Sequence, residues 1–171
     1  SSCWFPTIDA PNQKTSQEIY ITVPDRFKTL SNGELVSQTK NGDNRTDYWK
    51  MDQKHAPYLF FMGVGEYEVI EDNYKNIPVH YYVEKEYAPF AKDIFGDTPE
   101  MIGFFSDLLG VEDPWNKYHQ IVGRDYVSGA MENTTAVIHG EQANQMKGQL
   151  IDENRQENTI AHEIFHHWFG N

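Results

Sequence analysis

Two histidines near the end of the chain have the spacing of a metal site. In the sequence His162-Glu163-Ile-Phe-His166 the imidazoles stand four residues apart. Four residues of a helix turn by about 400°, so both rings lie on one face, one turn apart. Such a pair can bind one Zn²⁺, and Glu163 can then accept a proton from water on the metal. The alternative is a helix end whose exposed histidines interact with the helix dipole.

The residues around the motif favour the metal. Ile160, Ala161, Ile164 and Trp168 give the helix apolar faces that would bury the histidines, and buried imidazoles need partners. Catalytic zinc takes three protein ligands, and the chain stops at Asn171. The upstream candidates for a third ligand, none selected by its spacing, are Asp152, Glu153, Glu157 and His139. Either one of them is recruited, or the sequence is a piece of a longer chain.

The first part of the chain, to about residue 75, has a sequence pattern typical of antiparallel β-structure. Asn32-Gly33 and Asn41-Gly42 predict hairpin turns, because such pairs readily take positive φ angles. Short strands between turn signals indicate an antiparallel sheet or one layer of a sandwich. β-Branched and alternating runs predict these strands at residues 18–23, 47–51 and 58–70.

Helical periodicity follows a strand expected at residues 76–83. Thr98 is expected to cap a helix with Pro99 at its first position, and Gly110 to end it. The apolar residues of this helix form one stripe, which predicts core packing, at Met101, Phe104, Phe105, Leu108 and Leu109.

The rest of the chain alternates once more between strand and helix. We expect a strand at residues 118–127, a strand or loop after it, and a last helix at 156–169 that carries the histidines. The change from a strand-like to a helix-like sequence pattern predicts a domain boundary near residues 72–78. Three histidines outside the motif, His55, His80 and His119, are interpreted as surface or hydrogen-bonded core residues. His139 differs from them, because it lies on the strand that follows Glu132, and its side chain can point toward a cleft.

Composition excludes several classes of protein. The 171 residues carry 14 basic and 26 acidic side chains, a formal charge of −12, which does not suit a nucleic-acid backbone. No apolar run is long enough for a transmembrane segment. A single cysteine excludes a disulfide within the chain. Neither the oligomeric state nor the compartment can be read from the sequence.

Three stretches together resemble the aminopeptidase N-type zinc metallopeptidases. The run AHEIFHHWFGN is similar to the family's zinc-binding helix, and residues 129–133, GAMEN, match its exopeptidase signature. The first residues resemble the family's W-F-P-x-x-D-x-P-x-x-K stretch, which is matched by Trp4, Phe5, Pro6, Asp9, Pro11 and Lys14. The resemblance covers essentially the whole chain.

This resemblance implies an α+β fold of two parts. Residues 1–75 would be the C-terminal part of an N-terminal antiparallel β-sandwich of saddle shape. Residues 76–171 would be the first, truncated part of a thermolysin-like α/β catalytic domain. The family's third zinc ligand, a Glu on the next helix, and its oxyanion-stabilising Tyr would lie beyond Asn171. His167 departs from the family, where Gln is usual.

The resemblance also implies the role of each site residue. Zinc would be held by His162 and His166, and Glu163 would be the general base. The free α-ammonium of a peptide substrate would bind Glu132. The other residues of the signature would bind the rest of the substrate: Gly129 and Ala130 its backbone along a strand edge, and Met131 its first side chain.

The predicted function is therefore zinc-dependent hydrolysis of the N-terminal peptide bond of peptides, with little or no activity expected of this chain alone. A leukotriene-hydrolase-like member of the same family is one alternative. A second is a non-catalytic peptide-binding module that keeps Glu132 and holds no metal. A third, an endopeptidase of the thermolysin type, would cleave N-acetylated peptides, which an amine-binding Glu132 should forbid.

Overall fold

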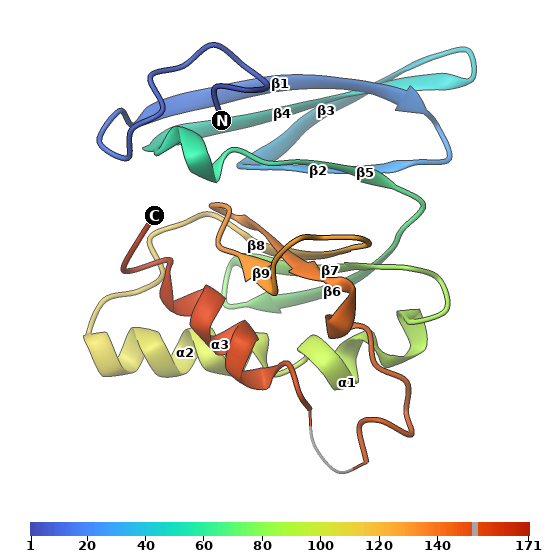
Figure 1. Ribbon diagram of the computed structural model, residues 1–171, viewed down its shortest axis with the longest axis vertical. Helices are drawn as coiled ribbons and strands as arrows, with labels where there is room; N and C mark the ends of the chain where they lie inside the picture. Colours follow the sequence, from blue (N-terminus) through green and yellow to red (C-terminus); the bar gives the residue numbers. More distant parts are fainter. Residues whose placement is uncertain (152–153) are drawn as a thin grey trace.

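Three β-sheets lie one above another, with helices beneath the lowest (Figure 1). The computed structural model describes residues 1–151 and 154–171. The two upper sheets are antiparallel, with strand orders β1-β4-β3 and β2-β5. They are formed by β1 (Thr15–Pro24), β2 (Lys28–Ser31), β3 (Glu34–Asn41), β4 (Asn44–His55) and β5 (Met62–Gly65), with the 3₁₀ turn η1 (Pro57–Leu59) before β5.

The third sheet is mixed and has the strand order β6-β7-β8-β10-β9. Its three central strands, β7, β8 and β10, run parallel, and the two outer strands run antiparallel to their neighbours. The strands are β6 (Glu68–Tyr74), β7 (Ile77–Val83), β8 (Tyr118–Gly123), β9 (Ala130–Met131) and β10 (Ala136–Gly140). The helices are α1 (Ala91–Phe95), α2 (Thr98–Leu109) and α3 (Glu157–Phe165), with 3₁₀ turns η2 (Ala88–Phe90) and η3 (Glu141–Ala143).

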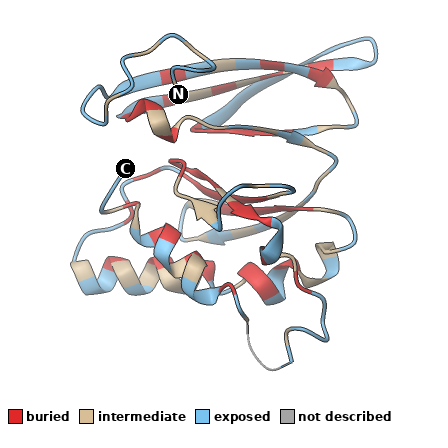
Figure 2. Ribbon diagram, in the orientation of Figure 1, coloured by how far each residue is buried: buried red, intermediate tan, exposed pale blue. Residues whose placement is uncertain are grey.

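Both faces of the third sheet are buried (Figure 2), because each packs against a different layer. The contact with the upper sheets includes Trp49 of β4, Leu30 of β2 and Tyr82 of β7. The contact with the helices is larger and includes Tyr81 of β7, Ile102 of α2 and Ile160 of α3. Neighbouring residues such as Tyr81 and Tyr82 face opposite layers, as the two-residue period of a strand requires.

The two Asn-Gly pairs have different roles. Asn41-Gly42 lies in the predicted hairpin: β3 pairs with β4 up to Asn41 and Asn44, and Gly42 has a φ of 60°. For Asn32-Gly33 the hairpin prediction is wrong, because β2 and β3 lie in different sheets. The pair carries the chain from one sheet to the other instead.

The strand predicted at residues 58–70 is interrupted: residues 62–65 form β5 and residues from 68 on form β6. Pro57 begins a 3₁₀ turn, β5 pairs with β2, and β6 leaves the upper sheets to pair with β7. The sheets therefore change between β5 and β6. The domain boundary near residues 72–78 stays a prediction.

The helix predicted from Thr98 is α2, and Gly110 ends it with a φ of 66°. The cap prediction is wrong: Asp97 precedes the helix without a side-chain capping bond. Thr98 is instead the first helical residue, and its hydroxyl accepts a hydrogen bond from Gln120 Nε2 at 2.9 Å. Gln120 is buried on β8, so Thr98 ties the start of the helix to the sheet.

The predicted apolar stripe of α2 only partly enters the core. Ile102 and Ser106 face the sheet and are buried, whereas Phe104 and Leu108 are 59% and 64% exposed. The core-packing prediction is wrong for these two residues, because the helix is oriented by its Thr98-Ile102-Ser106 face, with one residue per turn.

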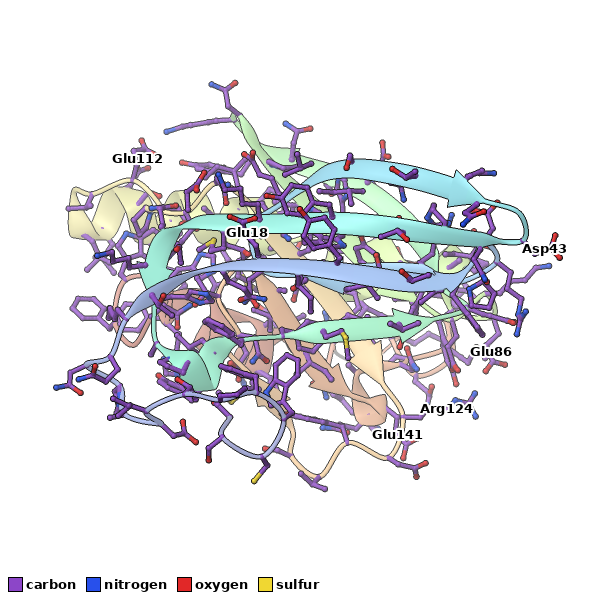
Figure 3. All side chains as sticks on the ribbon, turned by 90° about the horizontal axis from the view of Figure 1, so that it is seen from above. Glu18, Asp43, Glu86, Glu112, Arg124 and Glu141 are labelled. Atoms are coloured by element: carbon purple, nitrogen blue, oxygen red, sulfur yellow. The ribbon has the colours of Figure 1, made fainter. Side chains whose placement is uncertain are left out.

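Several charged side chains lie at the periphery. In Figure 3, Asp43 stands at the tip of the β3–β4 hairpin, and Glu86 lies beside Arg124. Arg124 binds Glu84 at 2.7 Å and Glu86 at 3.6 Å. Within residues 1–151 and 154–171, no helix has the length and apolar character needed to cross a membrane.

Two histidines predicted to be surface or hydrogen-bonded residues are neither. His55, at the end of β4, and His119 of β8 are buried, and their ring nitrogens have no hydrogen-bond partner among the described residues. His55 stacks on Phe60 with ring centres 4.7 Å apart. Burial, with a smaller effect of the Lys14 charge, lowers the pKa of His55 to about 4.

This burial predicts a pH-dependent stability. Above pH 6.5 the His55 imidazole is neutral in both states, so its stabilising contribution is fully present. As the pH falls from 6.5 toward about 4, the unfolded chain takes up the proton and that contribution is lost. At pH 5.5 the loss amounts to about 1 kcal/mol. The free energy of unfolding, measured in urea at pH 7.5 and at pH 5.5, should decrease less between these two values in His55→Phe than in the wild type. The difference should equal this amount. An equal decrease in both proteins would contradict the prediction.

Candidate metal and substrate site

The histidine motif lies on α3, which packs against the lower face of the third sheet (Figure 1). Ile160 and Ile164 are buried in this core, and His162, two residues from each, is exposed on another face. The helix ends at Phe165, earlier than residue 169, but His166 keeps helical dihedral angles. The one-turn spacing of the two imidazoles is therefore preserved.

The two imidazoles meet at their outer nitrogens. His162 Nε2 and His166 Nε2 are 3.2 Å apart, and the rings are nearly perpendicular. Two nitrogen ligands of one tetrahedral zinc, each about 2.0–2.1 Å from the metal, are about 3.3 Å apart. The pair therefore fits two positions of such a site.

The backbone after α3 orients the second imidazole. His166 Nδ1 lies 3.0 Å from the Phe169 carbonyl oxygen. A carbonyl only accepts, so Nδ1 carries the proton and Nε2 has its lone pair free for a metal. Gly170 makes this turn possible with a φ of 137°, and a Cβ there would lie 2.6 Å from His166 Nδ1.

Glu163 is buried beside the histidines. It is 5% exposed, and its Oε2 has no hydrogen-bond partner within the described part of the chain. Burial raises the pKa of Glu163 to about 7; the Glu132 charge adds to this effect and His166 opposes it. A carboxyl group with such a pKa can both accept and release a proton near neutral pH.

Glu132 reaches the same place from the sheet. The ligand-capable atoms of Glu132, Glu163 and His166 all lie within 4.8 Å of one another. Glu132 directly follows β9, the edge strand of the third sheet, which contacts α3. The fold thus brings together two carboxylates and an imidazole from segments about thirty residues apart in the sequence.

The signature residues before Glu132 form the sheet edge. Ala130 pairs with His139 and Met131 with Ile138, while the Gly129 carbonyl accepts a hydrogen bond from Gly140 N at 2.9 Å. Among residues 1–151 and 154–171, β9 has a strand on one side only, so its other edge can receive an extended peptide.

Sequence reasoning missed two tyrosines near the site. Tyr58, in η1 of the upper part, donates a hydrogen bond to the Gly170 carbonyl at 2.9 Å, so the C-terminal end lies beside η1 (Figure 1). Burial raises the pKa of Tyr58, and the Glu132 charge adds to the effect. Burial likewise raises the pKa of Tyr126, and the charges of Glu163 and Glu132 raise it further by smaller amounts. Neither tyrosine belongs to a spaced motif, so only the fold reveals them.

The candidate third ligands do not join this group. For His139 the cleft prediction is wrong: its ring is fully buried, and Nε2 hydrogen-bonds Gln120 Oε1 at 2.9 Å. Glu157 is exposed in the first turn of α3 and lies outside the cluster of ligand atoms in the described residues. Asp152 and Glu153 lie outside the described residues.

His167, which replaces the Gln usual in the resembling family, faces away from the two motif histidines. Its side chain is fully buried, and Nδ1 lies 2.9 Å from the carboxylate of Asp113. Its carbonyl accepts a hydrogen bond from Trp115 Nε1 at 3.0 Å. The residue ties the end of α3 to the loop before β8.

Comparison with protein families gives two matches along the chain. The sequence model of the Peptidase M1 N-terminal domain matches residues 1–59, and that of the Peptidase family M1 domain matches residues 94–171. The N-terminal domain match comes first and lies on strands of the upper sheets. The M1 domain match follows and lies on strands of the third sheet and on helices beneath it.

Curated relatives match along nearly the full chain. The mouse (Mus musculus) glutamyl aminopeptidase is 31% identical over 98% of this chain and 18% of its own length. Aminopeptidase M1 of Arabidopsis thaliana is 28% identical over 98% of this chain and 20% of its own length. The mitochondrial aminopeptidase 2 of Saccharomyces cerevisiae is 26% identical, with 98% and 18% covered. The chain thus spans about a fifth of the length of these relatives.

The turn over His166 gives a test of the metal site. In Gly170→Ala the new Cβ would press on His166 Nδ1 and turn the imidazole away, so zinc affinity should fall by about tenfold or more. Isothermal titration of the purified chain with zinc measures this effect. Gly148→Ala is the matched control, because a Cβ there meets nothing within 4 Å. Equal affinities for both variants would contradict the role of the turn.

Proposed function

Because the chain belongs to the peptidase M1 family, we propose that it carries part of the active site of a zinc-dependent aminopeptidase, which hydrolyses the N-terminal peptide bond of peptides. The observation that carries this proposal is the approach of Glu132, Glu163 and His166 to within 4.8 Å. The family match alone places no side chain. This cluster supports a catalytic arrangement because it joins one histidine of the proposed metal-ligand pair, a buried carboxylate and the residue that follows an edge strand.

The proposal includes the finer fold assignment. Residues 1–75 are proposed to be the end of a saddle-shaped N-terminal β-sandwich, and residues 76–171 the start of a thermolysin-like catalytic domain. The antiparallel upper sheets and the mixed sheet with its helices support this division. We propose little or no turnover for this chain alone, since it spans about a fifth of the length of its relatives.

His162 and His166 are the proposed zinc ligands. A zinc ion held by these two imidazoles would polarise the scissile carbonyl and would lower the pKa of a water toward about 7. Glu163 is proposed to accept the proton of the attacking water. Its burial and its unpartnered Oε2 support this role, because the oxygen is free to bind that water and the raised pKa permits later release of the proton.

Glu132 is the proposed anchor of the substrate. Its carboxylate pairs with the free α-ammonium, and partial burial strengthens that pairing. Gly129 and Ala130 hydrogen-bond the substrate backbone along the open edge of β9, and Met131 faces the first side chain. The short distance from Glu132 to His166 means that only the carbonyl next to a bound amine reaches the metal ligands.

A non-catalytic peptide-binding module is the second candidate. The open edge of β9 and the carboxylate of Glu132 support it, because neither needs a metal to bind an extended peptide with a free amine. The two candidates differ in whether this chain binds zinc.

The zinc pair is tested by titrating the wild-type chain and His166→Ala with zinc near neutral pH. One-to-one binding is expected in the wild type and should weaken by at least about a hundredfold in the variant, which keeps one imidazole. His80→Ala, which removes a histidine of β7, is the control and should bind as the wild type does. Weak binding that is equal in all three proteins would contradict a zinc site in this chain and favour the binding module.

The amine anchor is tested with one peptide in two forms, with a free N-terminus and N-acetylated. The wild type should bind the free form about tenfold more tightly, and Glu132→Gln should lose this preference because the amide carries no charge. Fluorescence anisotropy of the labelled peptides measures both affinities. Glu141→Gln, which changes another acidic residue near the same sheet, should keep the preference. Equal binding of the two forms by the wild type would reject the anchor.

A further inference from the structure

The loop that follows Glu132 is buried although it joins two strands. Asn133 is 6% exposed, and Thr134 and Thr135 are fully buried. A loop with polar side chains normally lies at the surface, because its backbone groups need water or partners. Here partners come from the upper part of the molecule, at Asn32 and Gly33, and from β8, where His119 N donates to the Thr135 carbonyl oxygen at 3.1 Å. We call Asn32, Gly33, Thr134 and Thr135 the clasp.

Asn32 forms the first half of the clasp. Its Nδ2 donates to the carbonyl oxygens of Thr134 at 2.6 Å and Leu59 at 3.0 Å, and its Oδ1 accepts from Phe61 N at 2.7 Å. The side chain is 1% exposed, so water does not replace these bonds. One amide thus joins residues 59–61 of the upper part to the loop after Glu132.

Gly33 forms the second half. Its backbone N donates to Thr135 Oγ1 at 2.8 Å. Thr135 has a φ of 64°, a conformation that is rare for a β-branched residue and persists only where neighbours hold it. Gly33 itself has a φ of 74°, and a Cβ there would lie 1.9 Å from the Lys50 carbonyl oxygen. Only glycine fits at this place.

A buried lysine directly before β8 supports the same turn. Lys117 Nζ donates to the carbonyl oxygens of Ser31, at 2.6 Å, and of Gly33. It also lies 4.4 Å from the ring centre of Trp49. The turn at Gly33 is therefore held by both the upper sheet and the third sheet.

The position of Glu132 depends on this loop. β9 contains only Ala130 and Met131, so Glu132 is the first residue beyond the pairing with β10. On its other side the chain is fixed at Thr134 and Thr135 by the clasp. Glu132 thus lies between two anchors, of which one belongs to the upper part of the molecule.

We infer that Asn32 and Gly33 are positioning residues for Glu132, through which the upper sheets help to set the selectivity for a free amine. The inference rests on the proposed role of Glu132 as the amine anchor. It gives the upper part of the molecule a role in substrate recognition through the backbone, without contact between Asn32 and the substrate. Removal of Asn32 leaves the buried Thr134 carbonyl and Phe61 N–H without their partner, which weakens the loop.

The experiment compares wild type with Asn32→Ala and Thr135→Val, which each remove one half of the clasp. Asn41→Ala is the matched control, because it changes the other Asn-Gly pair, at the hairpin of β3 and β4. Hydrogen exchange followed by mass spectrometry should show about tenfold faster exchange at residues 132–136 in both clasp variants, with β1 and β4 unchanged. The preference for the free over the N-acetylated peptide should fall about tenfold, while binding of the acetylated form stays constant.

Each outcome decides a separate point. Unchanged exchange at residues 132–136 in the clasp variants overturns the inference, as does faster exchange with the full amine preference retained. If the wild type itself shows no preference, the proposed role of Glu132 fails and the selectivity part of the inference with it, although exchange still reports on the clasp. If Asn32→Ala does not fold, Thr135→Val decides, and Thr135→Ser, which restores the hydroxyl, should recover both readouts.

Discussion

The packing of Ile160 and Ile164 against the third sheet is the contact on which the candidate site depends. These residues fix the rotation of α3, and that rotation decides which side chains of the motif are buried. Glu163, between them in the sequence, enters the protein and loses water, whereas His162 remains exposed. The raised pKa of Glu163 follows from the same burial. A helix rotated by one residue would exchange these environments and leave the carboxylate in solvent.

Prediction from the sequence succeeded where one local period decides the structure. The spacing of His162 and His166 fixes their shared face in any helix, and the observed contact between their Nε2 atoms agrees with it. Prediction failed where contacts between segments far apart in the sequence decide the structure. Asn32-Gly33 and Asn41-Gly42 are the same dipeptide, but only the second forms the predicted hairpin. The first is instead hydrogen-bonded to Thr134 and Thr135.

The same limit explains the remaining differences. Phe104 and Leu108 share a helical stripe with Phe105, and nothing in the period reveals which side of the stripe meets the sheet. His139 and Glu132 are close in sequence, but the third sheet directs one into its core and the other to its edge. The place of Glu132 in the site could be expected only through the family resemblance, since a lone carboxylate carries no spacing signal.

The hydrogen bonds of Asn32 and Gly33 to the loop after Glu132 span 102 residues of sequence. Contacts of such separation form late in folding, because a long stretch of chain must be closed before they add any stability. The β3–β4 hairpin and α2 are local and can form early. The surroundings of Glu132 are therefore completed only after both parts of the molecule have folded and docked, so a partly folded chain can hold the β3–β4 hairpin and α2 but lacks an ordered loop after Glu132.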